Sequence, residues 1–167
     1  MHKTFIRVKG LGYMLWQARH MAYHVMLGLL WAWFLRERWG VFNLTWIVTA
    51  AVGSLLPDVD HIYYFFGYGR RDSYTQQMFG LIRRNEWSRL FHFIATNQKN
   101  NTNLSYHNIY VVILLALFAG AASLVDWQTG VVLFGAMVLH YLFDIADDIV
   151  QLGGINSNWK RWGRPKQ

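Results

Sequence analysis

The sequence has no cysteine, only two prolines and few charged residues. Without cysteine the chain forms neither disulfides nor thiolate metal sites, so any metal must be held by histidine, aspartate or glutamate. Charged residues make up 15% of the chain, whereas 54% of its residues are hydrophobic and 17% are aromatic. Because a typical soluble domain is about 25% charged, this composition indicates a chain surrounded by lipid rather than by water.

Four apolar stretches have roughly the length that a membrane-spanning helix needs. They cover residues of about 20–36, 41–57, 106–125 and 128–151. Helices buried in soluble proteins are rarely this apolar on every side. No small-residue cleavage motif follows the first stretch, so we expect it to be a retained anchor. We therefore predict an all-α fold, a four-helix transmembrane bundle, in a single integral membrane domain of residues 1–167.

Basic residues are distributed unevenly along the chain. Fourteen of the sixteen lysines and arginines precede the first stretch, lie between the second and third, or follow the fourth, and only Arg36 and Arg38 lie elsewhere. Positive residues favour the cytoplasmic side, so we expect both termini, the central loop of about 62–105 and the basic tail of 152–167 in the cytoplasm. Basic loops that face anionic lipids explain the net charge of +7 without a nucleic-acid partner.

The central loop contains the segment "SYTQQMFGLIRRNEWSRLFHFIAT". Its apolar residues recur near helical spacing, with arginines between them, which is typical of an amphipathic helix lying on the membrane interface. A helical lid exposed to water would have the same pattern, and this alternative stays open.

Side chains that can bind metals occur at one end of each apolar stretch. The candidate ligands are His24, Asp58, Asp60, His61, His107, His140 and Asp144. The predicted topology places all of them near the cytoplasmic end of the bundle. An ionised side chain within the bilayer costs about 2.5–3.5 kcal/mol, and a bound divalent cation would offset that cost. For His20, which follows Arg19, we favour a simple interfacial location.

Nitrogen and oxygen ligands of this kind suit zinc best, with manganese or iron as alternatives. A carboxylate that is not fully used as a ligand, Asp60 or Asp148, could act as a general base. Asp148 also has a plainer interpretation, because it could simply mark the point at which the last helix leaves the membrane.

Four motifs occur in a characteristic order: His24 with Gly28, "LLPDVDH" at 55–61, His107 in "SYHN", and "HYLFD" at 140–144. In this order they resemble the LexA-regulated, inner-membrane-associated metal-dependent hydrolases and, more distantly, zinc-dependent phospholipase C and P1 nuclease. The resemblance implies a metal-dependent hydrolase of the bacterial inner membrane that acts on phosphoester or lipid-type substrates.

One part of the family pattern is missing. The family has H-R-G a few residues before T-H-S, but here the segment reads "NNTNLSYHN", and Asn108 replaces the serine. An arginine in that position could bind a substrate phosphate. The absence of this arginine argues against phosphoester activity more than against metal binding. Arginines of the central loop, Arg70, Arg71, Arg83 or Arg84, could take its place.

Three other functions fit parts of the pattern. The same ligands could serve a non-catalytic metal-binding or transport protein. Histidines on facing membrane helices could instead ligate the haem of a b-type cytochrome, although haem ligation would leave the aspartates without a role. A structural membrane protein could use the polar cluster only as a hydrogen-bond network.

Overall fold

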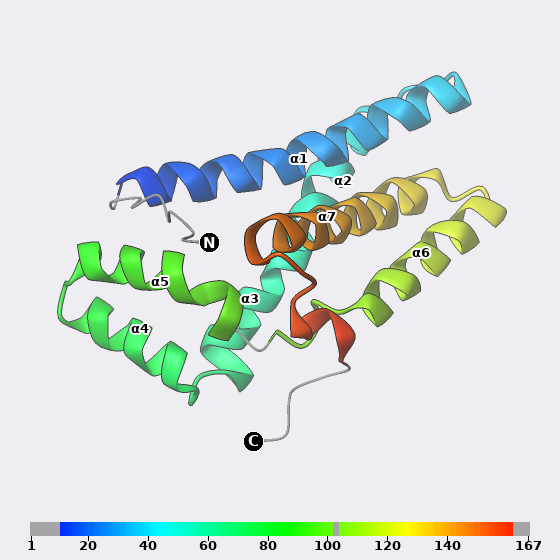
Figure 1. The fold of residues 1–167 in the computed structure, drawn as a ribbon. Coiled ribbons are helices and arrows are strands. Elements are labelled where there is room, and N and C mark those ends of the chain that lie inside the picture. The colour runs from blue at the N-terminus through cyan, green and yellow to red at the C-terminus, as the bar shows by residue number, and fades with distance from the viewer. Residues whose placement is uncertain (1–10, 102–103, 162–167) are drawn as a thin grey trace.

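The computed structural model describes residues 11–101 and 104–161, which are mostly helical and contain no strand. The all-α prediction is therefore confirmed for the described residues. The elements in chain order are α1 (Leu11–Trp39), α2 (Leu44–Leu55), η1 (Leu56–Asp58), α3 (Val59–Tyr63), η2 (Tyr64–Tyr68), α4 (Ser73–Arg83), α5 (Trp87–Asn101), α6 (Ile109–Leu124), α7 (Gln128–Leu152) and η3 (Ser157–Lys160) (Figure 1).

The helices differ in length from the predicted spans. Among the described residues, only α7 is both long and apolar enough to cross a membrane, and α6 is apolar but shorter, with 16 residues. The helix α1 is longer than expected, with 29 residues, and α2 is shorter, with 12. A single apolar helix of this kind also occurs in the core of soluble proteins, so the four-helix transmembrane bundle stays a prediction.

Pro57 changes the type of helix rather than ending it. The α2 helix stops at Leu55, but the chain continues through the 3-10 turn η1 directly into α3. Proline is compatible with the first turn of a helix because its missing N–H would have no intrahelical acceptor there. As a result Asp58, Asp60 and His61 lie on short helical segments that extend α2, and not on an open loop.

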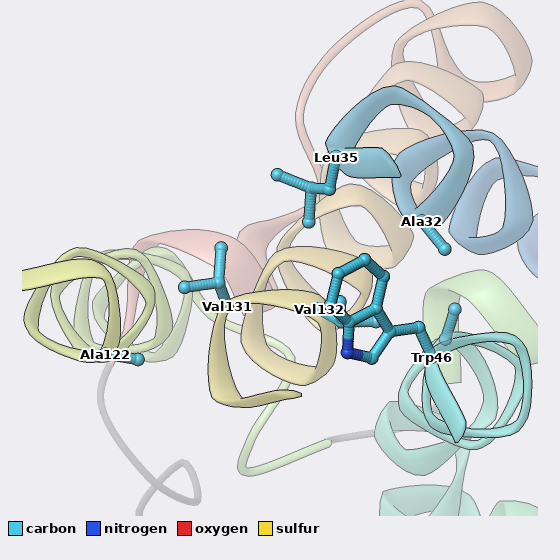
Figure 2. Packing of buried hydrophobic residues seen from close by; sticks show 7 residues of the cluster. Ala32, Leu35, Trp46, Ala122, Val131 and Val132 are labelled. Atoms are coloured by element: carbon cyan, nitrogen blue, oxygen red, sulfur yellow. The ribbon is translucent and has the colours of Figure 1, made fainter. Parts of the chain in front are cut away.

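The helix α7 is the centre of the fold and contacts α1, α2 and α6 (Figure 1). Small and apolar side chains from these four helices form the main core cluster, which comprises Ala32, Leu35, Trp46, Ala50, Ala122, Val131 and Val132. Figure 2 shows the indole of Trp46 from α2 lying against α7 near Val132, while Ala122 of α6 faces α7 from the other side.

The outward faces of α1, α2 and α6 carry many exposed apolar side chains. On α2 they recur every four residues at Leu44, Val48 and Val52, all about half exposed or more. The same faces of α1 and α6 add Met26, Leu30, Trp33, Phe34, Ile113, Leu114, Leu117 and Phe118. Large exposed apolar surfaces mark sites that contact lipid or another protein, so these three helices are candidates for such contact.

The central segment forms two helices and not the single amphipathic helix that its sequence predicts. The α4 helix ends at Arg83 and α5 begins at Trp87. The turn between them includes Asn85 with a φ of 55°, a left-handed conformation that asparagine tolerates better than most residues. The two helices therefore fold back against each other as a hairpin (Figure 1).

The contact between α1 and α2 requires glycine at position 28. A Cβ atom there would overlap Ser54 Oγ and lie 2.8 Å from the carbonyl oxygen of Ala50. We expect Gly28→Ala to lower the free energy of unfolding by roughly 1–3 kcal/mol, because the two backbones must move apart. In contrast, a Cβ at Gly120 meets nothing within 4 Å. Gly120→Ala should stabilise α6 by up to about 1 kcal/mol. Thermal unfolding of the two purified variants measures both effects, and equal melting temperatures would contradict this packing.

Candidate metal centre

Four parts of the chain bring histidines and aspartates together. His20 and His24 lie one turn apart on α1, and Asp58 ends η1. His107 precedes α6, and α7 carries His140 and Asp144 one turn apart. The local structure at His107 is fixed by Asn108, whose side-chain oxygen accepts a hydrogen bond from the N–H of Val111 at 3.0 Å. Asn108 thus caps α6, as a serine in this position also would.

The carboxylate of Asp144 lies between four imidazoles. Its Oδ1 is 3.2 Å from Nε2 of His24 and 3.4 Å from Nε2 of His20. Its Oδ2 is 3.2 Å from Nε2 of His140 and 3.6 Å from Nε2 of His107. Each oxygen of this one carboxylate therefore faces its own pair of histidines.

The donor atoms form two groups, in each of which all atoms lie within 4.8 Å of one another. The first group is His20, His24 and Asp144, and the second is Asp58, His107 and His140. With ligand bonds of 2.0–2.2 Å, two donors on a tetrahedral ion are about 3.3 Å apart. The separations around Asp144 are close to this value, so the donor set fits divalent metals in both number and spacing.

Two histidines are held with Nε2 directed at the cluster. Nδ1 of His140 lies 2.6 Å from the carbonyl oxygen of Ser54. A carbonyl only accepts, so Nδ1 carries a proton, and in the neutral ring Nε2 carries the lone pair. Nδ1 of His107 is 3.2 Å from Oδ2 of Asp60. Nε2 of both rings is buried and makes no hydrogen bond. This arrangement is typical of metal-binding histidines, whose other nitrogen donates to a carbonyl or carboxylate.

Asp60 is buried and receives hydrogen bonds from three sides. The hydroxyl of Tyr68 donates to Oδ1 at 2.6 Å, and the N–H of Tyr106 donates to Oδ2 at 2.9 Å. Burial by itself would raise the pKa of Asp60, but the hydrogen bonds from His107, Tyr68 and Tyr106 outweigh it and lower the pKa. Asp60 is therefore a carboxylate at neutral pH, and it contacts His107 rather than belonging to either donor group.

His61 lies beside the cluster, with its ring centroid 5.3 Å from that of His107. Burial lowers the pKa of His61 to about 4, so the ring is neutral at pH 7. Its Nδ1 is buried without a hydrogen-bond partner. Asp148, one turn beyond Asp144 on α7, accepts a hydrogen bond of 2.8 Å from the indole of Trp159. Neither His61 nor Asp148 belongs to the two donor groups, so their predicted roles as ligand and general base stay predictions.

The structure adds residues to the site that lie outside the predicted ligand set. His20 joins the first donor group, although its position next to Arg19 favours an interfacial location. Its spacing of four from His24, which is visible in the sequence, puts both rings on one helix face. The hydroxyl of Tyr68 holds the carboxylate of Asp60 in place, and the carbonyl of Ser54 holds the imidazole of His140. Trp159 packs near the cluster, with its ring 6.0 Å from that of His107.

Comparisons of the chain with protein-family models, with curated proteins and with solved structures gave no match. The resemblance of its motifs to the inner-membrane metal-dependent hydrolases is therefore a prediction from the sequence. The class that the site itself supports is a helical protein with a donor set for divalent metal.

Proposed function

We propose that the chain is a membrane-embedded, metal-dependent hydrolase that acts on phosphoester or lipid-type substrates. The observation that carries this proposal is the position of Asp144, whose two carboxylate oxygens each face a separate pair of histidine nitrogens. One carboxylate placed in this way could serve two divalent ions, one held with His20 and His24 and the other beside His107 and His140, with zinc as the best match to the donors.

The membrane location is supported by the exposed apolar faces of α1, α2 and α6 and by the apolar helix α7. We propose a bacterial-type inner membrane, as the resemblance of the motifs implies. Both termini would lie in the cytoplasm, because lysine and arginine flank the same ends of the apolar stretches. The metal centre would then lie at the cytoplasmic end of the bundle, within reach of the headgroups of the inner leaflet.

In this proposal some residues bind the metal and others orient the ligands. His24, His107, His140, Asp58 and Asp144 hold the metal together with His20. When bound, a divalent ion would lower the pKa of a coordinated water toward 7 and polarise the scissile ester. Asp60 positions His107, and the hydroxyl of Tyr68 holds Asp60. The Asp58 side chain is 34% exposed, which makes it the ligand most accessible to a substrate.

The test is metal analysis combined with a hydrolysis assay. We expect the purified full chain in neutral detergent to contain up to two equivalents of divalent metal by mass spectrometry, and His140→Ala to lose at least the equivalent that its donor group holds. The wild type should also hydrolyse a phosphodiester or phospholipid probe in a metal-dependent way. Equal, near-zero metal in the wild type and in the His140→Ala variant would refute the proposal and leave the polar cluster as a hydrogen-bond network.

A non-catalytic metal-binding or transport protein is the second candidate. The two predicted general bases, Asp60 and Asp148, both accept hydrogen bonds from protein donors. Neither carboxylate is therefore free to take a proton from water, which favours this candidate. Retained metal without hydrolysis of any probe, together with metal flux into liposomes, would support transport. Haem binding is less favoured. The rings of His24 and His140 stack with centroids 3.7 Å apart, which leaves no space for a porphyrin between this pair.

A further inference from the structure

A groove of about 790 Å³ lies between α4 and α5, away from the metal centre and without sharing a residue with it. Toward the turn of the hairpin it is lined by Arg83, Arg84 and Arg89. Toward the start of α4 it is lined by Ser73, Gln76 and Gln77, which add a hydroxyl and two amides. Gly80, Leu81 and Phe93 also line the groove. It is thus strongly basic at one end and of mixed polar and apolar character elsewhere.

The arginines outnumber the acids of the groove. Glu86, in the turn, is 3.3 Å from Nε of Arg84 and 2.8 Å from Nη1 of Arg89. Arg83 makes no ion pair within the described part of the chain. One glutamate therefore orients two guanidinium groups while the groove keeps an excess of positive charge. Such an arrangement favours an anion with several oxygens, because planar guanidinium groups bind phosphate with two parallel hydrogen bonds.

We propose that this groove binds the phosphate group of a phosphate ester, with Arg83, Arg84 and Arg89 as its contacts and Ser73, Gln76 and Gln77 reaching the alcohol side. The phosphate could belong to a lipid headgroup or to a water-soluble ester. Trp87, half exposed at the start of α5, favours the lipid, because tryptophan is enriched at the level of the headgroups. This inference does not depend on metal binding.

The experiment measures binding to the full chain in neutral detergent by calorimetry, with two probes: inorganic phosphate and dihexanoyl phosphatidic acid. We expect Arg83→Gln and Arg89→Gln each to weaken binding about tenfold or more, the effect of losing a charged hydrogen bond. Arg38→Gln removes an exposed arginine from α1 and should leave binding unchanged. Melting temperatures equal to that of the wild type would show that the variants fold.

The two probes separate the two sources of phosphate. Binding of phosphatidic acid at least tenfold tighter than binding of inorganic phosphate, with both weakened by Arg83→Gln, supports a lipid headgroup. Equal binding of the two probes with the same arginine dependence supports a water-soluble ester. The proposal is overturned if binding is unchanged in both groove variants, or if Arg38→Gln weakens it as much as they do. It is also overturned if neither probe binds. Metal content is unaffected in every case, so failure here is distinct from failure of the metal centre.

Discussion

Replacing Asp144 by alanine is expected to remove divalent metal from both donor groups at once. The wild type should bind up to two equivalents, and we expect Asp144→Ala to retain less than about a tenth of that amount. Each oxygen of Asp144 faces two imidazole nitrogens at 3.2–3.6 Å, so the substitution removes the only carboxylate of the first group and the negative charge beside His107 and His140 of the second. Mass spectrometry of the purified variant measures the loss.

The matched control for this variant is Asp147→Ala. Asp147 lies three residues further on the same helix, and its carboxylate accepts hydrogen bonds from the amide of Gln151 at 2.7 and 2.8 Å. It belongs to neither donor group, so this variant should keep the metal content of the wild type. A third variant, His20→Ala, tests the number of ions. It should lose one equivalent and keep the other, whereas a centre with a single ion would lose all or none.

That the candidate ligands lie close together could be predicted from two features of the sequence. The distribution of lysine and arginine predicts which ends of the apolar stretches lie at the same level, and a spacing of four places His140 and Asp144 on one face. These features are enough to place His24, His107 and Asp144 near one another. They say nothing of which atom of each side chain points inward, since that depends on neighbours distant in the sequence.

The contacts that orient the ligands could not be predicted for physical reasons. Ser54 acts through its main-chain carbonyl, which no residue type reveals. Tyr68 reaches Asp60 from eight residues away, across the π-helical turn η2, where Gly67 has non-helical backbone angles of φ −109° and ψ −110°. Regular helical spacing does not hold across such a turn. The α4–α5 hairpin could not be predicted for the opposite reason, because the apolar pattern continues through the turn at Asn85 although the helix is interrupted there.

The second large effect is expected at Asp60, which contacts His107 without joining the donor groups. We expect Asp60→Asn to lower the affinity for zinc about 10–100-fold, the usual cost of losing the carboxylate that orients a metal-binding histidine. The asparagine keeps the size of the side chain, but it loses the negative charge that favours the proton on Nδ1 of His107. Competition with a chromogenic chelator measures the affinity, and ¹⁵N NMR of the imidazole reports which nitrogen carries the proton.

Tyr68→Phe separates an orienting role of Asp60 from a role as a ligand. Burial and the hydrogen bond to Asp60 raise the pKa of Tyr68, so its hydroxyl is protonated and donates to Oδ1. If Asp60 orients His107, removing this donor loosens the carboxylate, and zinc affinity should fall several-fold. The control Tyr63→Phe changes an exposed tyrosine on α3 and should have no effect. If Asp60 instead binds the ion directly, Tyr68→Phe frees one of its oxygens from a competing donor. Zinc affinity would then stay the same or rise, and the orienting role would be wrong.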